Sequence, residues 1–240
     1  MHPQPPTRLL IGGMIFPGID QADFTGPFEV LSRLPKSEFL VIGRDTHPIR
    51  DVMGLILTPQ IARDATPPLD VLLVPGGPGV NELMEDEETL EFLRRQSAGA
   101  RLVLSVCTGA LLLGAAGLLQ GRRATTHWAS HHLLPLFGAI PQETRVVTDG
   151  NLVTTAGVTS GLDGALRAAA ILCGEATAQE IQLGMEYAPD PPFASGSPDT
   201  APPTVRSAVD EANREMVKIR TEISRRVAIR LGQETNPSLS

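Results

Sequence analysis

The sequence predicts an α/β fold in which helices cover both faces of a mostly parallel central sheet. Short apolar runs recur along the chain, and most of them end at Gly or Pro. Segments whose apolar residues have helical spacing lie between these runs. One run leads into a cysteine that is flanked by small residues and followed by an Ala- and Leu-rich segment. Strands that alternate with helices form parallel βαβ units, so this order predicts the class.

The composition limits the class of protein. A chain of 240 residues with 42% hydrophobic content is long enough for one large domain with a terminal extension. A net charge of −7 argues against a nucleic-acid partner, because phosphate binding needs a basic face. The sequence shows neither a charged-then-apolar leader nor an uninterrupted apolar run of membrane-spanning length. We therefore expect a cytoplasmic protein without membrane or nucleic-acid partners. Its two cysteines imply no disulfide framework.

The strands are predicted from short apolar runs bounded by turn residues. They are expected at residues 8–16, 38–44, 54–62, 69–77 and 101–107, the third being strand-like until Pro59. Residues 144–157 predict a hairpin, because Asp149-Gly150 stands between two β-rich runs and suits a tight turn.

The helices are predicted from apolar spacing and from acidic residues in a first turn. They are expected at residues 23–34, 86–100, 108–119, 159–173, 176–187 and 204–231. The chain then divides into a loose lead, an α/β domain, a Pro-rich loop with a helix that packs on the domain or on a dimer partner, and a tail. These segments are residues 1–7, 8–188, 189–231 and 232–240.

Cys107 stands where an expected strand meets an expected helix. The pattern SVCTG (residues 105–109) is small-x-nucleophile-x-small, which is typical of a nucleophile elbow. The flanking residues are small because a tight strand-to-helix turn leaves little room. Unpaired N–H groups at a helix start favour a thiolate, so the pattern predicts a nucleophile with a lowered pKa. The alternative is a buried core cysteine, and this is our interpretation of Cys173 on its apolar helix.

The turn VPGGPGV (residues 74–80) follows another expected strand. It lacks the spacing and the lysine of a phosphate-binding loop. A backbone N–H of Gly76 or Gly77, paired with that of Thr108, is a candidate for holding an anionic intermediate. An ordinary strand-end turn explains the motif equally well.

Two carboxylates are candidates for proton transfer near the end of the first strand. Asp23 stands between an alanine and a phenylalanine, where partial burial would raise its pKa and suit a proton donor. The alternative role for Asp23 is the N-cap of the following helix. Asp20 competes with it, and spacing alone does not separate the two.

The histidines are candidates for a partner of the cysteine or for metal ligands. His127 is the obvious member of a Cys–His pair, but the sequence gives no distance to Cys107, and we favour a structural role. His131 and His132 have no cysteine or carboxylate close by in the sequence, so no metal site is predicted.

Four segments together resemble the ThiJ/PfpI superfamily, and within it the isonitrile hydratase branch. They are FPGIDQADFTGPFEVL (16–31), PLDVLLVPGGPGV (68–80), SVCTGALLLGAAGLLQGRRATTHWA (105–129) and YAPDPPFASGSPDTAP (187–202). The resemblance covers about residues 8–230. It implies a flavodoxin-like three-layer sandwich with a cysteine nucleophile elbow, and it implies a homodimer.

The resemblance also implies site residues and an activity. In the hydratase branch an Asp contacts the nucleophilic Cys and a Thr follows that Cys, so these roles carry over to Asp23, Cys107 and Thr108. The implied reaction hydrates an isonitrile to an N-substituted formamide through a cysteine thioimidate, without a metal or organic cofactor. The protease-like branch has His directly after the Cys, and glutamine amidotransferases use a His-x-Glu pair, whereas this chain has neither.

Two alternatives from other classes remain open. One is a thiol sensor or protective protein in which Cys107 is oxidised rather than turned over. The other is a ligand-binding regulator. AraC-type regulators share GRRATTHW (residues 121–128) but add a DNA-binding region of about a hundred residues, which needs a basic face. Only a loop and one expected helix follow Tyr187 here.

Overall fold

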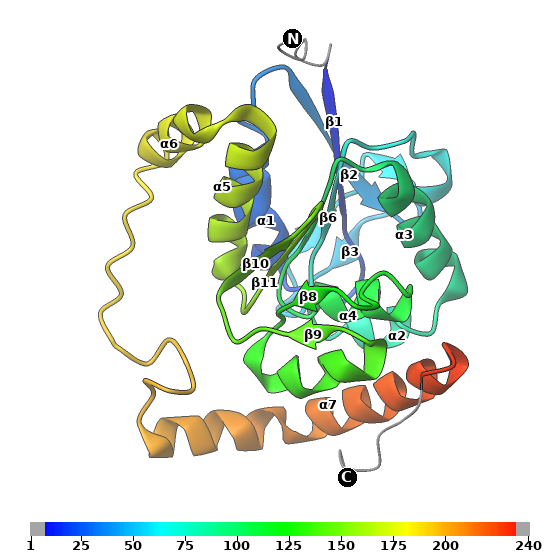
Figure 1. Cartoon of the computed structure of the whole chain (residues 1–240), viewed down its shortest axis with the longest axis vertical. Coiled ribbons are helices and arrows are strands. Elements are labelled where there is room, and N and C mark those ends of the chain that lie inside the picture. Colours follow the sequence, from blue (N-terminus) through cyan, green and yellow to red (C-terminus); the bar gives the residue numbers. More distant parts are fainter. Residues whose placement is uncertain (1–7, 234–240) are drawn as a thin grey trace.

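A seven-stranded sheet separates two layers of helices in the computed structural model, which describes residues 8–233 (Figure 1). In spatial order its strands are β10 (Val146–Asp149), β11 (Leu152–Thr155), β7 (Leu102–Ser105), β6 (Val71–Val74), β1 (Leu9–Met14), β2 (Ser37–Gly43) and β5 (Ile61–Ala62). All neighbours are parallel except β10 and β11. The predicted fold class is confirmed. The expected lead at 1–7 and most of the expected tail at 232–240 lie outside the described residues.

The helices form two groups on opposite faces of the sheet (Figure 1). One group is α1 (Gln21–Leu31), α5 (Ser160–Cys173) and α6 (Glu175–Gly184). The other is α2 (Val80–Leu83), α3 (Glu87–Gly99) and α4 (Gly109–Ala115). Every residue of β6 and β7 is buried, which explains why both read as continuous apolar runs rather than as alternating ones.

Most expected elements are present with shorter ends, and two differ for a clear reason. The run at 54–62 splits at Pro59 into β4 (Ile56–Leu57) and β5, and β4 instead forms a hairpin with β3 (Ile49–Arg50). The helix expected at 108–119 ends at Ala115 because Gly117 adopts a φ of 79° and the Leu118 N–H bonds back to Leu113.

The hairpin predicted at Asp149-Gly150 is present as β10 and β11. Two small elements between α4 and β10 were not predicted from the sequence. One is the 3₁₀ helix η2 (Trp128–Phe137), and the other is a short strand pair, β8 (Arg123–Ala124) with β9 (Ile140–Pro141). A short 3₁₀ turn, η1 (Arg63–Ala65), follows β5.

The last helix, α7 (Pro203–Arg230), follows a long loop that leaves α6 and runs along one side of the molecule (Figure 1). Its second half packs against α2, α4 and η2 of the same chain through Ile223, Val227 and Ala228. The first half is largely exposed. Of the helices in residues 8–233, none combines the length and apolar character needed to cross a bilayer.

Candidate active site

Three loops meet at one edge of the sheet because β1, β6 and β7 are adjacent and parallel. The loop after β1 leads into α1, the loop after β6 leads into α2, and the loop after β7 is the turn at Cys107. Hydrogen bonds join them: the Asp20 N–H donates to Gly76 O at 3.0 Å, and the Gly77 N–H donates to Thr108 Oγ1 at 3.0 Å. The sequence candidates from all three loops therefore lie in one place.

Cys107 occupies a strained turn between β7 and α4. Its φ is 54°, a left-handed conformation that costs a non-glycine residue about 1–2 kcal/mol. Two hydrogen bonds hold the strained backbone: the Cys107 N–H donates to Ala156 O at 2.9 Å, and Thr126 Oγ1 donates to Cys107 O at 2.7 Å. A Cβ on Gly109 would lie 2.1 Å from Val74 O, so the small flank is a steric requirement. The predicted elbow turn is present.

Asp23 lies in the first turn of α1 and is fully buried, with 0% of its surface exposed. Its Oδ2 accepts the Gly76 N–H at 2.9 Å, and its Oδ1 has no hydrogen-bond partner among the described residues. Burial raises the pKa of Asp23 to about 7, the charge of Asp20 adds to this, and the Gly76 N–H and the Cys107 side chain oppose it. A carboxyl group with this pKa exchanges its proton near neutral pH.

The N-cap of α1 is Asp20, not Asp23. Asp20 has an extended backbone, and its Oδ1 accepts the Ala22 N–H at 3.1 Å. The capping alternative for Asp23 is therefore wrong, and the two carboxylates that spacing left unresolved have separate roles. Asp20 holds the start of the helix, and Asp23 faces the buried site.

The prediction of a lowered Cys107 pKa is wrong for the resting site. Cys107 is 6% exposed, and burial raises the pKa of its thiol well above the usual range. The negative charge of Asp23 raises it further. The Thr108 N–H at the helix start and the charge of Arg220 do lower this pKa, but desolvation outweighs them. The resting cysteine is a thiol beside a carboxyl group that can take its proton.

Thr108, Gly76 and Gly77 form the support of the site. Thr108 is buried at the start of α4, and its Oγ1 accepts the Gly77 N–H. Gly76 donates its N–H to Asp23, so both glycine N–H groups that were candidates for an anionic intermediate are already bound to side chains. Gly77 has a φ of 128°, and a Cβ there would lie 2.4 Å from Asp20 N, so only glycine fits.

Arg220 is a site residue that was not predicted from the sequence. It lies on α7, far along the chain from the elbow, and its side chain is buried. Burial lowers the pKa of its guanidinium, and the charge of Cys107 opposes that shift. A signal was present: Arg220 precedes Ile223, Ser224 and Val227 at helical spacing, and these are the residues that α7 buries.

His127 is not hydrogen-bonded to Cys107 in the described structure. Its Nδ1 accepts the Ala129 N–H at 3.3 Å, and its ring packs beside Trp128. Burial lowers the pKa of His127 to about 4, with Arg220 contributing, so the imidazole is neutral at pH 7. The neighbouring His131 bonds to the Gln142 carbonyl. No group of potential metal ligands occurs within residues 8–233.

A cavity of about 560 Å³ lies close to the elbow, and Cys107 itself does not line it. Two of its lining residues, Thr126 and Ala156, are those that hold the Cys107 backbone. Its apolar walls include Trp128, Val158 and Pro198, the last from the long loop before α7. The elements that shape this cavity are therefore η2, the β9–β10 and β11–α5 connections and the Pro-rich loop.

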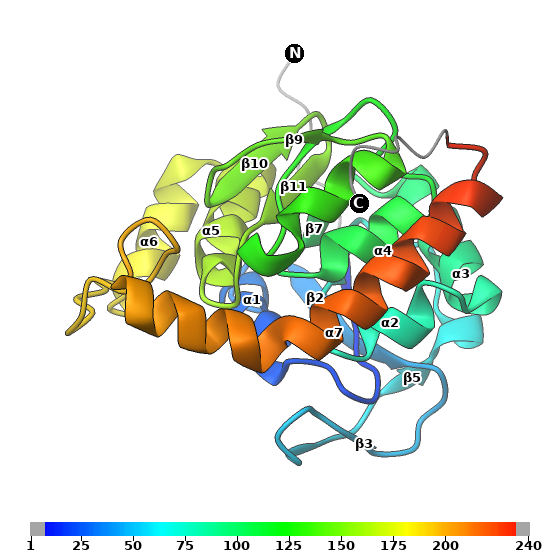
Figure 2. The ribbon, with the colours of Figure 1, turned by 90° about the horizontal axis from the view of Figure 1, so that it is seen from below.

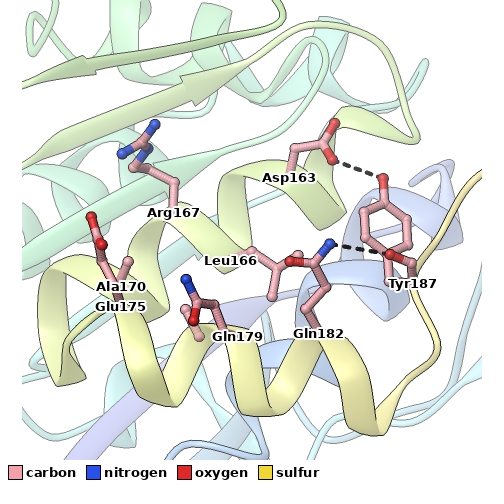
Figure 3. A pocket seen from close by; sticks show the side chains of 9 residues that line it. Asp163, Leu166, Arg167, Ala170, Glu175, Gln179, Gln182 and Tyr187 are labelled. Carbon is pink, nitrogen blue, oxygen red and sulfur yellow. Dashed lines mark hydrogen bonds between the residues drawn. The ribbon is translucent and has the colours of Figure 1, made fainter.

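A second hollow of about 400 Å³ lies between α5 and α6, away from the elbow (Figure 3). Its polar side chains bind one another: the Tyr187 hydroxyl donates to Asp163 at 2.8 Å, and Gln182 donates to the Tyr187 carbonyl. Cys173 ends α5 half-buried, and burial raises the pKa of its thiol. Nothing in this hollow resembles the arrangement around Cys107.

Comparison with known proteins gives consistent matches. The model of the DJ-1/PfpI family matches residues 11–170. The chain is 55% identical to the isonitrile hydratase of Pseudomonas putida over 226 residues, which are 93% of this chain and 98% of that protein. A crystal structure of a ThiJ/PfpI family protein from Pseudomonas syringae has a TM-score of 0.88 and 40% identity, covering 90% of each chain. The crystal structure of Drosophila melanogaster DJ-1beta has a TM-score of 0.67 and 25% identity, and covers 76% of this chain and 100% of that one.

Proposed function

The chain belongs to the DJ-1/PfpI family, and we propose that it is an isonitrile hydratase, which converts R–N≡C and water into an N-substituted formamide. One observation carries this proposal above the others. The 55% identity to the Pseudomonas putida hydratase extends over nearly the full length of both proteins, including the C-terminal loop and helix. The site supports it, because Cys107 in its strained turn stands beside a buried carboxyl group with a pKa of about 7.

In the first step the Cys107 sulfur bonds to the terminal isonitrile carbon. Asp23, in its carboxylate form, takes the thiol proton as the sulfur attacks and delivers it to the same carbon. The product is the thioimidate R–N=CH–S–Cys107. The sulfur and its former proton are now both bonded to the isonitrile carbon, and Asp23 is again a carboxylate. A pKa of about 7 suits this shuttle because the carboxyl group readily accepts and releases a proton near neutral pH.

In the second step water adds to the thioimidate carbon. The tetrahedral adduct then breaks its C–S bond, the sulfur regains a proton, and R–NH–CHO leaves. The role proposed for the Thr108 hydroxyl and backbone N–H is to hold the water or the developing charge, and its support is that Thr108 directly follows Cys107 and its N–H lowers the pKa of that thiol. Gly76 and Gly77 contribute by fixing Asp23 and Thr108 through their N–H groups. Both steps balance with water and this chain's own groups.

The substrate's R group is assigned to the 560 Å³ cavity beside the elbow. Trp128, Val158 and Pro198 supply apolar surface there. The lining also carries charged side chains of both signs, namely Glu143, Asp199, Arg145 and Arg206. An R group of moderate size with apolar surface and no net charge fits a lining whose acidic and basic side chains balance.

We further propose a cytoplasmic homodimer. The β3–β4 hairpin exposes a cluster of apolar side chains, and Met53 at its tip is 87% exposed. The hairpin projects from the body of the molecule (Figure 2) and bonds to the loop before α1, since the Val52 N–H donates to Ile19 O. An exposed apolar cluster of this kind favours a protein partner, and here the partner is a second copy. The interface would then lie next to the loop that carries Asp20 and Asp23.

The function is tested with the purified protein and a panel of small isonitriles. Formamide is measured by NMR, and its yield is compared with the enzyme concentration. The expected result is many turnovers per chain, loss of nearly all turnover in Cys107→Ala, and retention of it in the matched Cys173→Ala variant. A thiol sensor or a ligand-binding regulator would give at most one product per chain. Equal rates for Cys107→Ala and the parent would overturn the covalent mechanism.

A further inference from the structure

Helix α7 carries a buried arginine whose charge has no carboxylate partner in residues 8–233. Arg220 is 2% exposed. Its Nε donates to Asn81 Oδ1 at 2.8 Å, and its Nη1 donates to Ser130 Oγ at 3.0 Å. Both acceptors are neutral. A buried guanidinium is costly unless an opposite charge accompanies it, so the counter-charge has to be sought in the surrounding structure.

The two anchors of Arg220 belong to elements that border the elbow. Asn81 lies in the first turn of α2, directly after the loop whose Gly76 and Gly77 hold Asp23 and Thr108. Ser130 lies in η2 and bonds through its N–H to the His127 carbonyl. Figure 2 shows α7 running across α2 and α4, the helix that begins just after Cys107. The guanidinium is thereby fixed beside the strand ends of the site.

The charges that act on the Cys107 sulfur come from both sides. Asp23 and, more weakly, Asp20 oppose a negative sulfur from the α1 side. Arg220 favours a negative sulfur from the α7 side, and among the described groups that act on Cys107 it is the one with a positive charge. His127 packs near this arginine and stays neutral at pH 7. The sulfur is therefore acted on by two acidic groups and one basic group.

We propose that Arg220 is a positioning residue that serves as the buried counter-charge of the Cys107 thiolate. The inference deepens the proposed function and rests on it for the role of Cys107 as nucleophile. When the thiol proton moves to Asp23, the site's negative charge moves from the carboxylate to the sulfur, and the net charge of the pair is unchanged. Arg220 favours this transfer because it lies on the sulfur's side.

The test measures the pH profile of Cys107 alkylation by iodoacetamide in a Cys173→Ala background, where Cys107 is the single cysteine. Adduct formation is followed by intact mass. Arg220→Met keeps an unbranched side chain of similar length but removes the charge. We expect its profile to move about one pH unit upward, so that labelling below the midpoint slows about tenfold. Arg220→Lys, which keeps the charge, should restore most of the parent's rate.

The matched control is Arg226→Met on the same helix, because Arg226 is exposed and pairs with Glu85. Its profile should coincide with the parent's. If Arg220→Met does not fold, Asn81→Asp tests the proposal instead. This variant retains the arginine and its hydrogen bond but places a carboxylate against the guanidinium. The pH profile of labelling should therefore also move upward. If Arg220→Met folds and its pH profile equals that of the parent, the proposal is overturned. If Arg220→Met does not fold, a parent-like profile in folded Asn81→Asp overturns it. Labelling uses no isonitrile, so this outcome is independent of whether the protein hydrates one.

Discussion

At the scale of single residues, the site combines two groups whose pKa values are both raised. Burial acts on Asp23 and on Cys107 in the same direction, and the charge of Asp23 makes the thiolate less favourable. The two groups therefore titrate as a coupled pair and share protons rather than ionising independently. This arrangement suits a thiol that is activated during attack by a neighbouring base. It does not suit a thiolate that is present at rest.

Asp23→Asn tests the proton shuttle. The variant keeps the side-chain shape but cannot exchange a proton, so turnover should fall by about 10²–10⁴. In the parent, kcat/KM should rise with pH through about 7, because the carboxylate form of Asp23 is the base, and this rise should disappear in the variant. The measurement is the pH–rate profile of formamide production.

The matched control is Asp20→Asn, since asparagine caps a helix about as well as aspartate. Its rate should change far less than that of Asp23→Asn. A larger loss in Asp20→Asn would mean that the base has been assigned to the wrong carboxylate.

Asp23 also makes stability depend on pH. Its folded pKa is about 7 against an ordinary value of 3.8, so the folded protein binds this proton more tightly than the unfolded chain does. The associated stability is complete below about pH 4 and is lost as the pH rises to about 7. The melting temperature of Asp23→Asn minus that of the parent should therefore increase between these pH values. A constant difference would contradict the raised pKa.

Thr108→Val tests the hydrolytic step. The variant removes the hydroxyl that accepts the Gly77 N–H, while the backbone of the elbow stays in place. We expect the thioimidate to form and its hydrolysis to slow, so an adduct of substrate mass on Cys107 should persist longer than in the parent. Intact mass after mixing with excess isonitrile measures this.

Thr108→Ser retains the hydroxyl and is the control for Thr108→Val. It should resemble the parent. Parent-like turnover in the valine variant would limit Thr108 to starting the helix, and loss of turnover without an adduct would place its role in the first step.

At the scale of elements, four connections shape the cavity next to the elbow. They are η2, the β9–β10 connection, the β11–α5 turn and the loop before α7, and each lies outside the central sheet. Such segments vary in length and sequence at little cost to the fold, because the sheet and its helices carry the buried core. We therefore expect this cavity, rather than the elbow, to set which R groups are accepted.

Val158→Trp tests that expectation by filling the cavity from the β11–α5 turn. The KM for a bulky isonitrile should rise by about tenfold or more, while that for methyl isonitrile should change little. Leu166→Trp, which fills the hollow between α5 and α6, is the control and should leave both KM values unchanged. Equal effects of Val158→Trp on both substrates would place the R group elsewhere.

At the scale of the whole molecule, the long α7 joins the end of the chain to the site. Its second half is buried against α2, α4 and η2. Its first half is exposed, and so is the hairpin formed by β3 and β4 (Figure 2). The exposed hairpin bonds to the loop that leads to Asp20 and Asp23. Association through this hairpin would therefore order a loop of the site as well as bury apolar surface.

Light scattering tests the association. The parent should have twice the chain mass of 25.5 kDa at micromolar concentration, and the double variant Met53→Asp/Ile56→Asp should have the single-chain mass. A charge placed at the centre of an apolar contact is buried without a partner, which disfavours the dimer. Leu183→Asp changes an equally exposed apolar residue on α6 and should remain dimeric. A parent of single-chain mass, or a dimer that only Leu183→Asp disrupts, would contradict the proposed interface.

Local sequence patterns were sufficient for the elements and for the elbow. Apolar runs predicted the buried strands, Asp149-Gly150 predicted the β10–β11 hairpin, and the small residues around Cys107 predicted its strained turn. These features depend on neighbours within a few residues, so they are readable without tertiary information. The position of Asp23 near a strand end made it a candidate proton donor beside Asp20, and the resemblance to a known family favoured Asp23.

Only the tertiary structure decided the electrostatics of the site. The pKa of Cys107 depends on its burial and on Asp23, which is distant in sequence, and both outweigh the local effect of the helix start. The roles of Asp20 and Asp23 were assigned by burial, because Asp23 lies in the core whereas Asp20 caps the helix. Arg220 reaches the site because α7 folds back over α2 and η2, and helical spacing alone does not show what a buried face will cover. Desolvation and charge act through space, so they are determined by contacts that no local pattern contains.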